Sequence, residues 1–137
     1  LTNGVFDILH KGHIEILKFA KTQGDKLIVA IDSDRRVKEL KGDNRPVNNE
    51  EDRRRVLETN RYVDEVVIFD SVEELRGFYQ TLSPNVIIKG SEWTADEVRV
   101  RDNIPDSIQI KVYPLVGNYS TTSTMQKIRS METCEKI

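Results

Sequence analysis

Short runs of apolar residues recur along the chain. Residues 27–31 form an unbroken run, and 65–69 and 85–88 are similar after a polar first residue. Such runs are too short for helices and do not alternate, which is typical of strands buried on both faces of a parallel sheet. Residues 108–113 alternate apolar and polar, which predicts a strand nearer a sheet edge. The chain opens on what looks like the end of a strand, and we expect the natural protein to extend before Leu1.

Helical patterns separate these runs. Ile14, Leu17 and Ala20 share one face of a predicted first helix that ends near Gly24. Two capping-box signatures open the next helices. They are Asn48 with Glu51, for a helix to about Thr59, and Ser71 with Glu74, followed by apolar residues at helical spacing to Leu82.

A last helix is predicted to begin within 120–122, to carry Met125 and Ile128 inward, and to give way to a polar tail from about 131. Strands that alternate with helices imply right-handed crossovers, so we expect one domain over 1–137 of the α/β class. We predict a three-layer fold with a parallel sheet and helices on both faces. Ligands of such folds bind at the carboxyl ends of the strands. The segments 4–13, 32–34 and 89–93 fall at these ends.

Composition narrows the class of protein. The 137 residues carry 21 Lys and Arg against 23 Asp and Glu, a net charge of −2, which disfavours a general nucleic-acid binder. No run approaches the ~20 apolar residues of a membrane-spanning helix. The single cysteine, Cys134, has no partner for an internal disulfide, so a reducing cytoplasm is expected.

The clearest chemical motif is His10 and His13 with Gly12 between them. If a helix begins near His10, both imidazoles lie on one face of its first turn, where free backbone N–H groups and the helix dipole favour an anion. Gly12 lacks a Cβ and lets a bulky ligand approach the backbone. The segment therefore predicts a phosphate site.

Further residues are suited to a polyphosphate. Lys38, Lys41 and Arg45 lie in and beside a loop at 42–49, and Arg61 precedes a strand. The hydroxyls and amides of 120–122 offer a second helix start. By contrast, the arginines at 53–55 are expected to lie mostly on a solvent-exposed helix face. Among them, Arg53 is the residue expected to take a functional role.

Taken in order, residues 5–13 (VFDILHKGH), 61–66 (RYVDEV) and 119–122 (YSTT) resemble the cytidylyltransferase-type nucleotidyltransferase superfamily. The resemblance runs from residue 1 to about 130. It implies a Rossmann-like fold and transfer of a nucleoside monophosphate from ATP or CTP to a phosphorylated sugar or polyol, with release of pyrophosphate.

Different parts of the sequence resemble two different branches of the superfamily. Residues 2–10, 40–48 and 89–90 resemble the heptose 1-phosphate adenylyltransferase domain of ADP-heptose synthesis, whereas 61–66 and Trp93 are closer to glycerol-3-phosphate cytidylyltransferase. Leu115 stands where the glycerol-type enzyme carries an arginine, which favours the heptose type. Ser91-Glu92 departs from the heptose-type Gly-Asp. A non-catalytic nucleotide-binding protein is the alternative from another class.

The resemblance also implies roles. His10 and His13 donate hydrogen bonds to the triphosphate, Lys41 reaches the acceptor phosphate or α-phosphate, and Arg61 pairs with the triphosphate. The nucleotide-binding residues are expected to be Val5, Phe6, Gly12, Gly90, Ser120, Thr121 and Thr122. The expected contacts of the phosphorylated substrate are Lys41, Arg45, Lys89 and Trp93, with loop packing as the alternative for Trp93. Mg²⁺ is expected with no protein ligand assigned, and a homodimer through 61–66 fits the superfamily.

Overall fold

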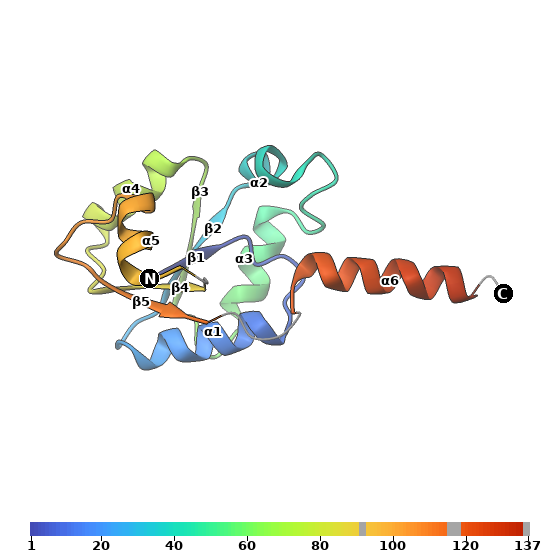
Figure 1. Cartoon of the computed structure of the whole chain (residues 1–137), viewed down its shortest axis with the longest axis horizontal. Coiled ribbons are helices and arrows are strands. Elements are labelled where there is room, and N and C mark those ends of the chain that lie inside the picture. The colour runs from blue at the N-terminus through green and yellow to red at the C-terminus, as the bar shows by residue number, and fades with distance from the viewer. Residues whose placement is uncertain (91–92, 115–118, 136–137) are drawn as a thin grey trace.

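Five parallel strands form one sheet in the order β3-β2-β1-β4-β5 (Figure 1). The computed structural model describes residues 1–90, 93–114 and 119–135. The strands are β1 (Thr2–Gly4), β2 (Ile28–Asp32), β3 (Glu65–Phe69), β4 (Val86–Gly90) and β5 (Gln109–Tyr113). The helices are α1 (Lys11–Thr22), α2 (Asp34–Lys41), α3 (Glu50–Glu58), α4 (Val72–Thr81), α5 (Ala95–Asp102) and α6 (Thr121–Glu135).

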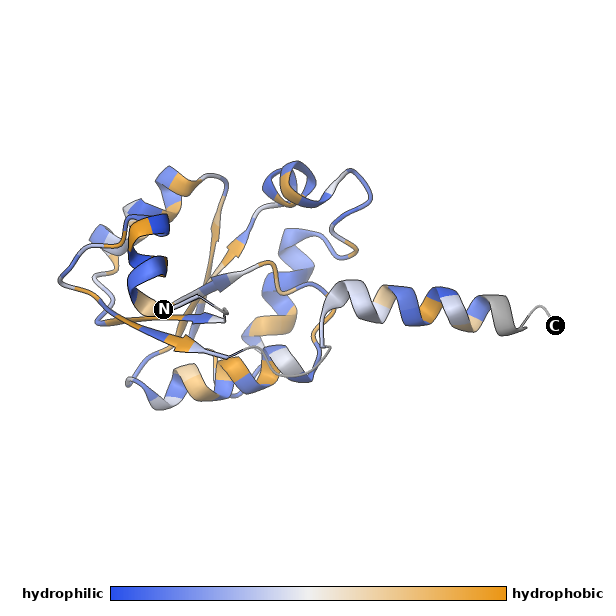
Figure 2. Cartoon of the chain, in the orientation of Figure 1, coloured by the Kyte–Doolittle hydropathy of each residue, from blue (hydrophilic) through white to orange (hydrophobic). Residues whose placement is uncertain are grey.

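Apolar side chains pack on both faces of the sheet. Figure 2 shows orange, hydrophobic stretches along β2, β3 and β5. On one face, Leu17 of α1 and Leu57 of α3 pack with Val29 of β2. On the other, Leu75 of α4 and Val98 of α5 pack on a second cluster that includes strand residues. Helices on both faces and strands apolar on both sides confirm the predicted three-layer α/β fold.

The strand order places a topological switch between β1 and β4. Chain direction along the sheet reverses there, because β2 and β3 follow on one side of β1 and β4 and β5 on the other. At such a point the loops after two neighbouring strands diverge and leave a crevice beyond the carboxyl ends. The loop after β1, which carries the His10 motif, is therefore at the expected place for a ligand.

Local details both confirm and correct the predictions. Residue Ser71 caps α4, accepting a hydrogen bond from Glu74 N, and the alternating strand β5 lies at the sheet edge. The cap of α3 is Asn49 rather than Asn48, because the Asn49 side chain accepts from Asp52 N. Helices α2 and α5 were not predicted, although Ser33 and Thr94 cap them in the same way.

Helix α6 extends away from the sheet and its flanking helices (Figure 1). The prediction that it carries Ile128 inward is wrong, since that residue is 51% exposed. The physical reason is that only the start of the helix meets the domain. The segment from 131, expected to be a polar tail, is helical as far as Glu135. In the described part of the chain no helix is long and apolar enough to cross a membrane.

Candidate active site

The loop after β1 has a strained, compact backbone. Phe6 and Ile8 have positive φ angles of 51° and 49°, a conformation that non-glycine residues rarely adopt. The Phe6 ring folds back so that a Cβ on Gly4 would lie 3.0 Å from its Cε2 atom. The same ring lies 5.1 Å from that of His13, centroid to centroid. Glycine at position 4 therefore lets Phe6 support the histidine.

His10 and His13 cap the first turn of α1 reciprocally. His10 is the N-cap residue, and its Nδ1 accepts from His13 N at 3.4 Å, while His13 Nδ1 accepts from His10 N at 3.3 Å. The two rings stack with centroids 3.8 Å apart. Because each Nδ1 acts as an acceptor, each neutral ring carries its proton on Nε2. The cap therefore leaves two Nε2–H donors.

Burial keeps this histidine pair neutral. It lowers the pKa of His13 to about 4, with a further contribution from the neighbouring His10, and it also lowers the pKa of His10. Above pH 7 both rings are uncharged donors. They can bind a phosphate through hydrogen bonds without first losing a proton.

Glycine is needed at position 12 for packing, in addition to the close approach of a ligand that the sequence predicts. A Cβ there would lie 2.9 Å from His10 Cε1 and 3.2 Å from the Cβ of Tyr119. Real Cβ atoms do not tolerate the first of these distances. The glycine thus makes room for the His10 ring.

Asp7 joins three segments at the site. Its carboxylate accepts hydrogen bonds from the backbone N–H groups of Val47, at 2.6 Å, and Asn48, at 3.0 Å. Its carbonyl accepts from the hydroxyl of Thr121 at the start of α6. The 42–49 loop and α6 are therefore both held against the β1 loop, a role that the sequence analysis did not assign.

Arg53 is the buried exception among the three arginines of α3, with 2% of its surface exposed. Its guanidinium donates to the carbonyls of Asn48, Val5 and Asp32 at 2.8–2.9 Å. A further bond reaches the Asp34 carboxylate at 2.9 Å. The Arg53 guanidinium is therefore hydrogen-bonded to four segments at once. They are the β1 loop, the end of β2, the 42–49 loop and α2.

The α6 start uses its hydroxyls within the protein. Ser120 Oγ accepts from Ser123 N at 2.9 Å and so caps the helix, while Thr121 is bound to Asp7. Thr122 Oγ1 accepts from Arg45 Nη1 at 3.4 Å. The Arg45 Nε is buried and has no hydrogen-bond partner in the described ranges. Among the residues that the structure describes, no acceptor meets this cationic donor at the helix start.

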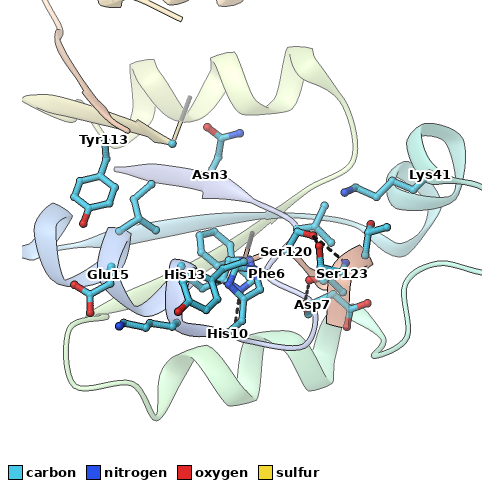
Figure 3. A pocket seen from close by; sticks show the side chains of 18 of the residues that line it. Asn3, Phe6, Asp7, His10, His13, Glu15, Lys41, Tyr113, Ser120 and Ser123 are labelled. Atoms are coloured by element: carbon cyan, nitrogen blue, oxygen red, sulfur yellow. Dashed lines mark hydrogen bonds between the residues drawn. The ribbon is translucent and has the colours of Figure 1, made fainter. Parts of the chain in front are cut away.

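A cavity of about 940 Å³ opens between these segments. Figure 3 shows Lys41 pointing into it from one flank, Tyr113 and Glu15 on the other, and the histidine pair between. The predicted residues that line it are Val5, Phe6, His10, Gly12, His13, Lys41, Arg45, Gly90, Ser120, Thr121 and Thr122. Most of the predicted set is therefore brought together.

Four predicted residues lie outside the lining, namely Lys38, Arg61, Lys89 and Trp93. Lys38 Nζ donates to the Arg45 carbonyl at 3.2 Å. Arg61 is exposed and precedes β3, at the amino edge of the sheet, away from the cavity. Lys89 is buried, with 8% exposed, and binds Asn3 and Asp102. Trp93 is 46% exposed, and the guanidinium carbon of Arg101 lies 4.7 Å from its ring centroid. Ser91, Glu92 and Leu115, on which the choice between branches depends, lie outside the described residues.

Several lining residues were missed. Some follow from topology, because Asn3 and Tyr113 lie at the carboxyl ends of β1 and β5 and Glu15 is one helical turn beyond Lys11. The remaining missed residues are Asp7, Lys11, Ile16, Pro114, Tyr119 and Ser123. Within the ranges described, no group of three or more His, Cys, Asp or Glu side chains is arranged to hold a metal ion.

The fold and the cavity together define an α/β domain of the class that binds its ligand at the switch between β1 and β4. The chain belongs to the Cytidylyltransferase-like family, which matches residues 1–134. This confirms the predicted nucleotidyltransferase superfamily.

Individual relatives refine the comparison. The chain is 45% identical over 128 residues to the bifunctional protein HldE of Campylobacter fetus, covering 93% of this chain and 27% of that protein. It is 41% identical over 128 residues to HldE of Koribacter versatilis, covering 93% and 26%. The chain thus spans about a quarter of the length of these curated relatives.

A solved structure is also similar. The lipopolysaccharide core biosynthesis protein of Thermoplasma volcanium aligns with a TM-score of 0.66 at 25% identity, covering 86% of this chain and 95% of that one. The α/β architecture is therefore shared along nearly the whole length of that protein.

Proposed function

We propose that this chain transfers a nucleoside monophosphate from a nucleoside triphosphate to a phosphorylated sugar, with ATP and heptose 1-phosphate as the substrate pair. The observation that carries the proposal is the stacked histidine pair, with two Nε2–H donors, in a cavity that Lys41, Arg45 and the α6 start also line. The similarity to bifunctional HldE proteins and to a lipopolysaccharide core biosynthesis protein supports a sugar phosphate as acceptor.

The chemistry asks little of a general base. An oxygen of the acceptor phosphate, already anionic near neutral pH, forms a new bond to the α-phosphorus. The bond between that phosphorus and the α–β bridging oxygen breaks, and pyrophosphate leaves with the electron pair. The difficulty is to bring two anions together in line and to stabilise the charge on the leaving group.

The residues of the cavity supply that stabilisation. The neutral histidines donate to phosphoryl oxygens, and Lys41 and Arg45 add positive charge from the 42–49 side. The Arg45 Nε is buried and meets no acceptor in the described part of the chain, so it is suited to a phosphate oxygen. Rigid donors of this kind are effective because they need no rearrangement as the transition state forms.

Mg²⁺ is proposed to enter with the triphosphate. Mg²⁺ in such enzymes is commonly held by the substrate's phosphates, water and one or two carboxylates, and not by an all-protein cage. The described residues offer no such cage, and no protein ligand is assigned. The single cysteine and the nucleotide substrate fit a reaction in the cytoplasm.

A pyrophosphate-release assay tests the proposal. Purified protein is given ATP or CTP with heptose 1-phosphate, glycerol 3-phosphate or a panel of other phosphorylated sugars and polyols. Turnover with ATP and heptose 1-phosphate is the expected result. Turnover only with CTP and glycerol 3-phosphate would identify the other branch, and tight nucleotide binding without turnover on any acceptor would identify a binding protein.

A further inference from the structure

Beside the phosphate site lies a buried polar group that the proposed reaction does not use directly. The Lys89 ammonium, on β4, donates to Oδ1 of Asn3 on β1 and pairs with Oδ2 of Asp102 in α5 at 3.2 Å. Only 10% of the Lys89 side chain is exposed. Burial lowers the pKa of Lys89, and the Asp102 carboxylate opposes that shift.

This contact fixes the orientation of the Asn3 amide. A lysine ammonium has three donors and no acceptor, so the Asn3 atom that faces it must be the carbonyl oxygen. The amide nitrogen is then directed away from Lys89. A flipped amide would place its N–H₂ group against the Lys89 ammonium, so this contact excludes the flipped orientation of Asn3.

Asn3 also lines the cavity. Thr2 of β1 is in register with Ile88 of β4, and Asn3 and Lys89, which are in contact, each come one residue later, toward the carboxyl ends of these strands. Gly90 lines the same cavity. Figure 3 shows the Asn3 side chain at the end of β1, separate from the histidine pair. The amide is therefore at the topological switch, where α/β folds bind nucleotides.

We propose that Asn3 donates a hydrogen bond from its amide nitrogen to a phosphate or ribose oxygen of the bound nucleotide, and that Lys89 and Asp102 are positioning residues that hold the amide in this orientation. Lys89 thus serves the site through Asn3, and not by touching the phosphorylated substrate. The inference rests on the proposed function only in that the ligand is a nucleotide.

The test is nucleotide binding by isothermal titration calorimetry, with ATP and CTP as probes and the tighter of the two used for the variants. Asn3→Ala is expected to weaken binding about 10-fold or more, the effect of losing a hydrogen bond to a charged or polar oxygen. Lys89→Met is expected to weaken it similarly, because the amide is free to rotate. Lys26→Met, which removes a surface pair with Glu65 at the start of β3, is the matched control and should bind as the wild type.

A double-mutant cycle separates positioning from structure. If Lys89 acts through Asn3, Lys89→Met has little further effect on the dissociation constant in the Asn3→Ala background. Since Lys89→Met leaves the Asp102 carboxylate without its lysine partner and paired with Arg101, the cycle is repeated with Lys89→Met and Asp102→Asn together, which removes both charges of the Lys89–Asp102 pair. Urea unfolding reports stability independently of binding.

Wild-type affinity in Asn3→Ala, or additive effects of the Asn3 and Lys89 substitutions, would overturn the inference. A wild-type protein that binds nucleotide but turns over no acceptor would refute the proposed transfer reaction and leave this inference standing. Absence of binding to either nucleotide would overturn both. A shift of the Asn3 side-chain amide resonance in ¹⁵N-labelled protein on nucleotide addition gives a second, direct readout.

Discussion

The Nδ1 atom of His10 accepts the backbone N–H of His13, and the Nδ1 atom of His13 accepts the backbone N–H of His10. Serine or threonine with glutamate or glutamine normally makes this reciprocal box. Imidazoles make it here with one nitrogen each and keep the other nitrogen for a ligand. The same two side chains therefore combine a structural cap with the donors of the proposed phosphate site.

Because of this arrangement, catalysis can be separated from capping. Asn is among the best N-cap residues, so His10→Asn is expected to keep the cap and lose the Nε2 donor. We expect a fall in kcat of about 100- to 1,000-fold with pyrophosphate release as the assay. The free energy of unfolding in urea should change by less than about 0.5 kcal/mol, whereas His10→Ala should lower it by about 1 kcal/mol. A large loss of stability in His10→Asn with activity retained would show that the ring serves only the helix.

The pKa of His13 predicts the direction of a pH effect on stability. In the unfolded chain the ring has its ordinary value of 6.5, and in the folded protein the value is about 4. As the pH falls from 6.5 to 4, only the unfolded state takes up the proton, so the free energy of unfolding decreases. Above 6.5 this contribution is constant and fully present. Urea unfolding from pH 4 to 8 should show a steeper acid loss for the wild type than for His13→Gln, whose glutamine retains the capping-box acceptor. Parallel profiles would contradict the shift.

In Gly12→Ala, the higher helix propensity of alanine is opposed by a steric clash with the His10 ring. Alanine is favoured in a helix by about 1 kcal/mol, but its Cβ would lie 2.9 Å and 3.0 Å from two atoms of the His10 ring. We expect displacement of the ring and at least an approximately 10-fold loss of kcat/KM, on the scale of a misplaced catalytic group. Gly77→Ala in α4 is the control, because nothing lies within 4 Å of its Cβ, and it should gain about 0.5–1 kcal/mol with unchanged activity.

The substitution Arg53→Lys keeps the positive charge and removes the planar guanidinium group with its several N–H donors. A lysine has one nitrogen with which to replace bonds to three carbonyls and a carboxylate. Leaving buried acceptors unpaired is expected to destabilise the fold by about 2–3 kcal/mol. Arg54→Lys on the same helix, paired with Glu51 at the surface, should cost less than about 0.5 kcal/mol. Thermal or urea unfolding measures both, and equal effects would mean that the buried network contributes little.

Much of this fold is predictable because its strands are apolar on both faces and most of its helices carry clear caps. The apolar spacing that predicts helices is missing where a helix is short and highly charged. Helix α2, for example, buries only Val37. Apolar spacing also misplaced Ile128, because periodicity reports that a face is apolar and not whether another element covers it.

For the candidate site, Lys41 was predicted from its place beside the 42–49 loop, and 120–122 from hydroxyls at a helix start. Residue type and the position after a strand pointed to the His10 motif. The same reasoning placed Lys89 among substrate contacts, since it ends a strand at the right edge. Its side chain turns instead into the sheet to meet Asn3 and Asp102. Asp7 was missed because its partners are backbone N–H groups about 40 positions away, which leave no trace in local pattern.

The bond between the Asp7 carbonyl and the Thr121 hydroxyl joins positions 114 residues apart. Such a contact closes one of the longest loops available to this chain and has to await the emergence of α6 from the ribosome during synthesis. A nascent chain can therefore assemble its sheet before the start of α6 completes the wall of the cavity. A chain that stops short of residue 121 would keep the core of the sheet and lack one side of the proposed nucleotide site.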